Sequence, residues 1–262
     1  AREDIDAIID EIVKNVPLYD FTADDGIQHT FWKVEKDDLI NTLTAKFAEV
    51  KYLYIADGHH RCASGVAVGK KKRAANPNHS GNEEYNYVMG VIFPHNQLYI
   101  MDYNRIVADL NGLTTDEFLN KVSEKFIIEK FSSDEPYKPE STHTYGMYIA
   151  GTWYKMSAKQ GTFCKEDPVK SLDVAIIQDN LLEPILGIQD PRKDKRIDFV
   201  GGIRGLKELS MRVDKGEAVA ISMYATSVEE LMAIADAGKI MPPKSTWFEP
   251  KLRSGLINHL LD

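Results

Sequence analysis

The residues best suited to chemistry form the run Asp57-Gly58-His59-His60-Arg61. A short apolar, β-prone run, Tyr52–Ala56, leads directly into it, and a helix of about fifteen residues is expected to follow, to about Ala75. A glycine turn between a strand and a helix directs several backbone N–H groups to one point, and the helix dipole adds about half a positive charge there. The pattern therefore predicts a phosphate-binding turn that opens a helix.

The side chains of this turn suit the same role. Gly58 can adopt a positive φ and lets a ligand approach the backbone. His59 and His60 can donate to phosphate oxygens, and Arg61 can hold them in a bidentate fork. The alternative is an ordinary turn with partly exposed histidines and a surface ion pair at Arg61. A metal site at Asp57, His59 and His60 is the weaker interpretation, because adjacent histidines point apart on a helix; no metal ligands are predicted.

A second candidate anion-binding segment lies near the end of the chain. Pro242-Pro243 stiffens the backbone ahead of Lys244, Ser245 and Thr246, which could present an amine and two hydroxyls to an anion. The alternative is a rigid connector with solvated charges around a buried Trp247-Phe248. No His or Asp lies nearby in the sequence to activate the hydroxyls, so neither is predicted to be a nucleophile.

Several isolated residues carry weaker signals, and an ordinary structural role is favoured for most of them. His29 is expected to be a strand residue with a local partner, and Cys62 a small core residue. Gly201-Gly202 has the composition of a strand-to-helix turn that could form a second anion nest. Asp173 and Asp179 are expected to be surface charges on a helix rather than magnesium ligands.

The composition restricts the class of protein. The 262 residues are 43% hydrophobic and 27% charged, which excludes a disordered or fibrous chain. No apolar run is long enough to span a bilayer, and a net charge of −8 argues against a general nucleic-acid binder. The two cysteines, Cys62 and Cys164, are too few for a disulfide framework. A cytoplasmic location is expected.

Periodicity and turn signals predict a mixture of helices and hairpins. Helices are expected at residues 4–16, 37–47, 114–126, 171–182, 203–214 and 228–237, and single strands at 28–34, 196–200 and 218–224. Hairpins are expected at 85–93 with 98–107, and at 144–149 with 152–157. Thr114 and Glu117 have the spacing of a capping box. The polar, Pro-containing stretch 132–140 is the expected linker between a phosphate-binding part at 1–131 and a C-terminal part at 141–262. The predicted class is α+β with a mixed sheet.

Three motifs carry a resemblance to a known family. Ala56–Arg61, Asp102-Tyr103-Asn104-Arg105 and the late Met241–Lys251 together resemble family 1015 of the domains of unknown function, over about His29–Leu256. Members of that family carry a further N-terminal portion, so this chain is expected to correspond to the C-terminal two-thirds of such a protein.

The first motif also resembles the phosphate-binding turn of the ParB/sulfiredoxin superfamily, which includes a kinase that phosphorylates free serine. That resemblance implies that Asp57, His59, His60 and Arg61 hold the phosphates of ATP or ADP, with magnesium, near the reacting hydroxyl. The serine kinases use a glutamate base from an early segment, and no residue of this chain matches it. Catalytic residues are therefore not assigned.

Three functional hypotheses follow. The first is a nucleotide-dependent small-molecule kinase of the ParB/sulfiredoxin type, acting on serine or a related hydroxy metabolite. The second is a non-catalytic module that binds a nucleotide or phosphometabolite and regulates a partner. The third, a chromosome-partition-like DNA adaptor, is disfavoured by the acidic charge balance. The oligomeric state and the acceptor substrate are not predicted.

Overall fold

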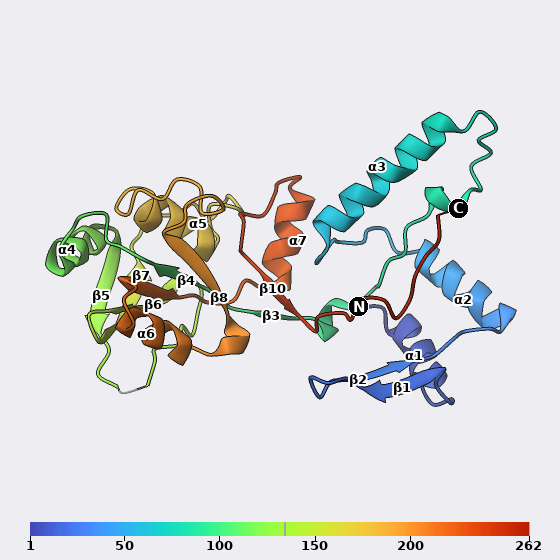
Figure 1. Ribbon diagram of the computed structural model, residues 1–262, viewed down its shortest axis with the longest axis horizontal. Helices are drawn as coiled ribbons and strands as arrows, with labels where there is room; N and C mark the ends of the chain where they lie inside the picture. Colours follow the sequence, from blue (N-terminus) through green and yellow to red (C-terminus); the bar gives the residue numbers. More distant parts are fainter. Residues whose placement is uncertain (134, 262) are drawn as a thin grey trace. The chain divides into compact units, whose positions relative to one another are not determined.

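The chain divides into two compact units. The computed structural model describes residues 1–133 and 135–261. Unit 1 comprises residues 1–98 together with those from Ser254 onward, and unit 2 comprises Tyr99–Arg253 (Figure 1). Within the described residues, every helix is too short or too polar to cross a bilayer.

Unit 1 combines helices with one small hairpin. Its elements are α1 (Glu3–Ile12), β1 (Tyr19–Thr22), β2 (Gln28–Phe31), α2 (Asp37–Ala48), α3 (His59–Ala75) and 3₁₀ turns at Glu84–Asn86 and His95–Gln97. β1 and β2 pair in antiparallel register, and the rings of Tyr19 and Phe31 stack with centroids 5.2 Å apart. Among its described hydrophobic side chains only Ile5 and Ile12, both on α1, are buried. Local packing within this unit is therefore sparse.

Unit 2 is built on a six-stranded antiparallel sheet. The strands of unit 2, counting those outside this sheet, are β3 (Tyr99–Met101), β4 (Tyr103–Val107), β5 (Phe126–Lys130), β6 (Thr144–Ile149), β7 (Thr152–Ala158), β8 (Ile197–Gly201), β9 (Val219–Ser222) and β10 (Trp247–Glu249). The main sheet has the order β5-β7-β6-β9-β4-β8, and β10 pairs separately with β3. Its helices are α4 (Thr115–Lys125), α5 (Asp173–Ile177), which continues as a π-helical turn over Gln178–Leu182, α6 (Lys207–Asp214) and α7 (Val228–Asp236).

Both faces of the main sheet are covered, because side chains on a strand alternate between its faces. On β6, Tyr145, Met147 and Ile149 join a core that includes residues of α4, α5 and α7. Tyr148 points to the other face and joins a smaller core with Leu209 of α6. β4 lies between β8 and β9, so it is an interior strand with both faces buried. A side chain on β4 is thus held firmly by its neighbours.

The α+β class and many elements are confirmed. Helices at 37–47 and 228–237, the hairpin 144–149/152–157 and the strands at 196–200 and 218–224 form within a residue or two of the predicted bounds. The capping box is present, since Thr114 Oγ1 accepts from Glu117 N and Glu117 Oε2 accepts from Thr114 N at 2.8 Å. Every described strand pair is antiparallel, however, where a mixed sheet was expected.

Two strand predictions are wrong. Residues 52–56 form no strand, and Tyr52 and Leu53 are more than 60% exposed. Residues 85–93 form no strand either, and β3 pairs with β10 instead. Both segments are apolar and β-prone, but β propensity becomes a strand only where a neighbouring strand supplies hydrogen bonds. The helix expected from residue 203 starts at Lys207, because Gly205 has φ +73° and ψ 161°, outside the helical region.

The stretch 132–140 lies within unit 2. Tyr137 is buried, and its carbonyl oxygen accepts a hydrogen bond from Ser222 Oγ at 2.9 Å. The division into functional parts at 1–131 and 141–262 stays a prediction; Asp134, in the expected linker, lies outside the described residues.

Candidate functional site

Helix α3 begins directly after a glycine in the left-handed region. Gly58 has φ +83°, and its N–H donates to Oδ1 of Asp57 at 2.8 Å. The first intrahelical bond runs from Cys62 N to Gly58 O at 2.9 Å. The predictions that this run opens a helix and that Gly58 takes a positive φ are therefore confirmed. The strand expected ahead of it is absent, so the turn follows a segment without regular secondary structure.

Arg61 folds back over the turn. An ideal Cβ placed on Gly58 would lie 2.9 Å from both Nε and Nη2 of Arg61, so any other residue would displace the guanidinium. The same guanidinium lies 4.0 Å from Oδ2 of Asp57, and the two side chains are 74% and 59% exposed. An exposed pair of this kind contributes about 0–1 kcal/mol. An incoming anion can therefore displace the carboxylate from Arg61 at small cost.

The N-terminus of α3 is open to an anion. The capping position is a glycine, which has no side chain to cap the helix. The first N–H groups of an α-helix have no intrahelical acceptor, and the dipole of this 17-residue helix favours negative charge there. His59, His60 and Arg61 are all exposed. In the described part of the chain, no group of three His, Cys, Asp or Glu side chains is placed to hold a metal ion.

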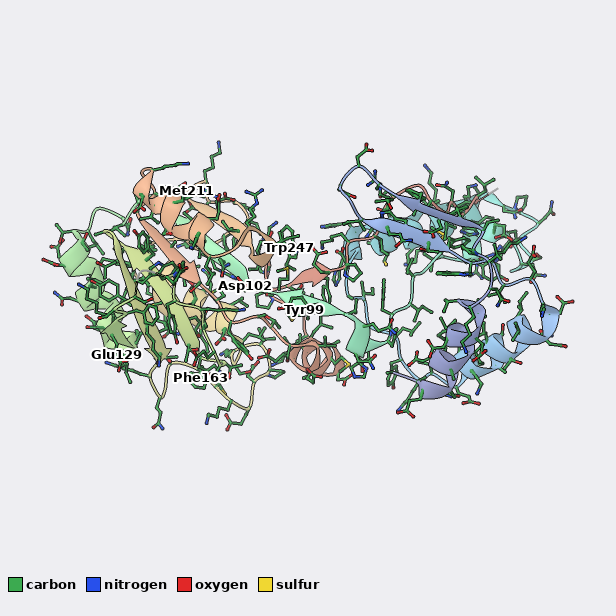
Figure 2. The ribbon with its side chains drawn as sticks, turned by 90° about the horizontal axis from the view of Figure 1, so that it is seen from below. Tyr99, Asp102, Glu129, Phe163, Met211 and Trp247 are labelled. Atoms are coloured by element: carbon green, nitrogen blue, oxygen red, sulfur yellow. The ribbon has the colours of Figure 1, made fainter. Side chains whose placement is uncertain are left out.

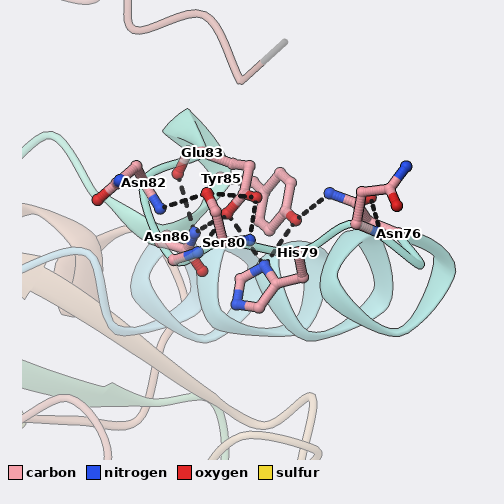
Figure 3. Close-up of polar contacts among 9 residues, drawn as sticks. Asn76, His79, Ser80, Asn82, Glu83, Tyr85 and Asn86 are labelled. Carbon is pink, nitrogen blue, oxygen red and sulfur yellow. Dashed lines mark hydrogen bonds and ion pairs between the residues drawn. The ribbon is translucent and has the colours of Figure 1, made fainter.

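The opposite end of α3 is fixed by the loop that follows it. A Cβ on Gly69 would lie 2.8 Å from the carbonyl oxygen of Tyr85, so the close contact between helix and loop requires a glycine here. The hydroxyl of Tyr85 forms hydrogen bonds with Nδ1 of His79 at 2.9 Å and with Nδ2 of Asn76 at 3.0 Å (Figure 3). These contacts tie the loop back to its helix.

Glu83 organises the same loop. Its Oε1 accepts from the N–H and hydroxyl of Ser80 at 2.6 and 3.0 Å, and its Oε2 accepts from Gly81 N at 3.0 Å (Figure 3). His79 Nδ1 lies 3.0 Å from the same carboxylate. These donors, the Ser80 N–H first, lower the pKa of Glu83 to about 2. The loop is thus held by a carboxylate that stays ionised.

The late segment places its three candidate residues in different environments. Ser245 is buried, and its hydroxyl donates to the carbonyl oxygen of Pro242 at 2.6 Å. Thr246 is half-buried. Lys244 is exposed, has φ +57°, and places Nζ 3.3 Å from the hydroxyl of Tyr103. Of these three residues, Lys244 is the exposed one, and its amine could donate to an anion from solvent. Anion binding by Lys244, Ser245 and Thr246 stays a prediction.

Two motifs about 140 residues apart meet in unit 2. Nη2 of Arg105 donates to the carbonyl oxygen of Lys244 at 3.1 Å. The rings of Tyr103 and Trp247 meet edge to face with centroids 5.4 Å apart. Asp102 and Trp247 lie near one another in Figure 2, where β10 pairs with β3. The late motif therefore contacts and stabilises β4, the strand that carries Arg105.

Gly201 and Gly202, at the end of β8, pack against the same two motifs. A Cβ on Gly201 would lie 2.6 Å from the indole of Trp247. A Cβ on Gly202 would collide with the carboxylate of Asp102, whose carbonyl oxygen accepts from Gly202 N at 2.8 Å. Close packing accounts for both glycines without an anion nest.

A buried group of titratable side chains lies behind this junction. Arg105 is 3% exposed and donates to the carbonyl oxygens of Tyr103 and Lys244. Burial lowers its pKa to about 10, although Tyr103, Tyr145 and Asp173 act in the opposite sense. Burial also raises the pKa of Tyr145 above its usual value.

The prediction that Asp173 is a surface charge is wrong. It is 7% exposed, and its Oδ1 accepts from His143 N at 2.7 Å and from the Tyr145 hydroxyl at 2.9 Å. Burial raises its pKa to about 7, against the opposing effect of these two hydrogen bonds. Residues 174–177, all apolar, follow it directly and leave α5 without a polar face. That pattern was the sequence signal of a buried helix. Asp179 is exposed, as expected.

The remaining single residues have local roles. His29 is half-buried on β2, with its ring 5.4 Å from that of Phe21, and its buried Nε2 has no hydrogen-bond partner among the described atoms. Cys62 is half-buried in the first turn of α3. Glu84 forms an ion pair with His259, with Oε2 2.8 Å from Nε2.

Comparison with known proteins places the chain in a family. A family model described as "Protein of unknown function (DUF1015)" matches residues 1–175, which include both the turn and Asp102–Arg105. The chain belongs to this family. The description of DUF1015 names no activity. No curated protein matches the sequence.

Solved structures show only weak similarity to this DUF1015 chain. Free serine kinase in complex with AMP is 11% identical, with 95% of this chain and 80% of that chain covered and a TM-score of 0.38. A mutant of free serine kinase in complex with AMP is 13% identical over 58% of this chain and 55% of that chain, with a TM-score of 0.36. A conserved hypothetical protein from Pyrococcus furiosus is 13% identical over 81% of each chain, with a TM-score of 0.40. Similarity at this level assigns neither a site nor an activity.

Proposed function

We propose that Asp57, Gly58, His59, His60 and Arg61 bind the phosphates of ATP or ADP, and that the protein is a nucleotide-dependent small-molecule kinase of the ParB/sulfiredoxin type. The observation that carries the proposal is the geometry of Gly58. Gly58 has a left-handed backbone and no side chain, and the exposed guanidinium of Arg61 lies beside it at the start of α3. Backbone N–H groups, the helix dipole and a guanidinium then act on the same oxyanion.

Magnesium enters this proposal with the nucleotide. Mg²⁺ in such sites is held by one or two carboxylates together with substrate phosphates, so a preformed cluster of protein ligands is not required. Asp57, whose Oδ2 lies 4.0 Å from Arg61, is the carboxylate within the turn. The acceptor is a hydroxyl compound such as serine, and no residue is assigned as its general base.

The test is calorimetric titration of ADP and ATP, with and without magnesium, into the 262-residue chain. Arg61→Ala is expected to weaken binding by about 1.5–3 kcal/mol, the range for hydrogen bonds to charged groups. Arg73→Ala is the matched control, because Arg73 is an exposed arginine in the last turn of the same helix. Equal affinity in wild type and Arg61→Ala would remove Arg61 from the site.

The kinase step is tested separately from binding. Phosphotransfer from ATP to serine and its analogues is measured for the 262-residue chain. Since a positioned base contributes about 10²–10⁴-fold, this chain is expected to bind nucleotide better than it turns it over. Nucleotide binding without phosphotransfer to any of these acceptors would favour a regulatory module instead.

A further inference from the structure

Arg105 on β4 is a buried cation whose charge is not neutralised by direct contact. Its hydrogen-bond acceptors are the backbone carbonyls of Tyr103 and Lys244, and no ion pair joins it to a carboxylate among the described residues. A guanidinium has five N–H donors, so three remain beyond those two bonds. Asp173 acts on it through space rather than by a hydrogen bond, and the Oδ1 of Asp173 accepts from His143 N and the Tyr145 hydroxyl instead. A buried charge in this state favours an anionic partner.

Arg105 also lines a cavity of about 340 Å³, within unit 2, which lies in the size range of small-molecule sites. Its walls include Arg105 of β4, Val174 of α5, Leu182 of the π-helical turn, Phe199 of β8, and Pro242 and Pro243 of the late motif. Val174, Leu182 and Phe199 make part of this wall apolar. The late motif closes the cavity through its two prolines, so this motif and the strand motif at Asp102–Arg105 meet around the same space.

Two arginines, Arg105 and Arg192, line the cavity, and a carboxylate binds only the second of them among the described residues. Arg192 is bound in a fork by Asp190, with Nε and Nη2 at 2.9 and 3.0 Å from its two carboxylate oxygens. The amide nitrogen of Gln178 donates to Ile188 O at 2.7 Å, which leaves its oxygen to accept. The wall thus offers the Arg105 guanidinium, which keeps N–H donors beyond its two carbonyl bonds, together with amide groups and apolar surface. A larger hollow of about 420 Å³ along α6 has only solvent-exposed lysines as cations and no buried charge.

We propose that this cavity binds a small organic acid, with its carboxylate on Arg105 and an apolar body against Val174, Leu182 and Phe199. A carboxylate matches the charge of a single guanidinium and its planar donor geometry. Phosphate, with more negative charge and no apolar part, suits the site less well. The assignment does not depend on the proposed kinase function, because every lining residue belongs to unit 2 and the phosphate-binding turn to unit 1.

The test is calorimetric titration of the 262-residue chain with isovalerate, benzoate, the uncharged isovaleramide and inorganic phosphate. Arg105→Met removes the charge, and Arg204→Met is its control, an exposed arginine that does not line the cavity. Gln189→Trp fills the cavity mouth from an exposed position, so it preserves the core if Arg105→Met fails to fold. Gln160→Trp, exposed and away from the cavity, is the control for the added indole.

Isovalerate or benzoate is expected to bind at millimolar concentration or below, and isovaleramide at least about tenfold more weakly. Arg105→Met and Gln189→Trp should each weaken carboxylate binding by about 10- to 100-fold, while the two controls leave it unchanged. The proposal is overturned if neither carboxylate binds, if the amide binds as well as the acid, or if Gln189→Trp has no effect. Binding of phosphate in preference to both carboxylates would also overturn it.

Discussion

Asp173 gives unit 2 a pH dependence that can be isolated by one substitution. Its carboxyl group is buried at the start of α5, and burial raises its pKa from 3.8 to about 7. Asp173→Asn removes the ionisable group. The amide oxygen can still accept from His143 N and from the Tyr145 hydroxyl, which both donate to Oδ1 in the wild type. The substitution therefore separates the charge from the hydrogen bonds.

The magnitude follows from the two pKa values. Between pH 3.8 and about 7 the folded state binds the proton that the unfolded state has already released. The free energy of unfolding therefore falls as the pH rises through this window. At 1.36 kcal/mol per pKa unit, the shift from 3.8 to about 7 corresponds to about 4 kcal/mol. Above pH 7 the wild type carries this full penalty, and the variant carries none.

The assay is urea unfolding of both proteins from about pH 4 to about pH 8. Asp173→Asn should match the wild type near pH 4 and exceed its free energy of unfolding by up to about 4 kcal/mol near pH 8. Asp179→Asn, an exposed carboxylate in the following π-helical turn, is the matched control. A difference between wild type and Asp173→Asn that is constant over the whole range would refute the claim that burial holds this group protonated.

Three further predictions concern the turn, the cap and the loop. Gly58→Ala should lose about 1–2 kcal/mol through its left-handed φ and also weaken ADP binding by displacing the neighbouring guanidinium. Gly65→Ala, a mid-helix change whose added Cβ would meet Val88 at an ordinary 3.8 Å, should keep binding intact in the same titration. Thr114→Ala should lower the free energy of unfolding by about 1 kcal/mol in a urea titration, because it removes half of the capping box. Glu83 holds its loop fully above pH 4.5 and should release it as the pH falls through about 2, because its carboxylate then becomes protonated. Hydrogen exchange of the Ser80 amide should accelerate in that window, and unchanged protection there would contradict the role of this carboxylate.

Local signals were sufficient for elements whose determinants lie close together in the chain. Thr114 and Glu117 are three residues apart, so their capping box could be recognised directly. The β6–β7 hairpin is short and alternates clearly, and it also forms as predicted. The run Tyr52–Ala56 has equal β propensity but no partner strand. This run forms no strand, because β propensity alone does not provide the hydrogen bonds of a neighbouring strand.

The sequence by itself determined the α+β class, the helix that starts at His59 and the need for a glycine before it. These depend on residue type, periodicity and backbone sterics within one segment. Only the tertiary structure decided that Arg105 and Asp173 are buried, and that the late prolines close a cavity beside Arg105. Burial of a charge depends on what packs against it from distant parts of the chain. Here strand pairing and the 3.1 Å contact between Arg105 and Lys244 bring those parts together.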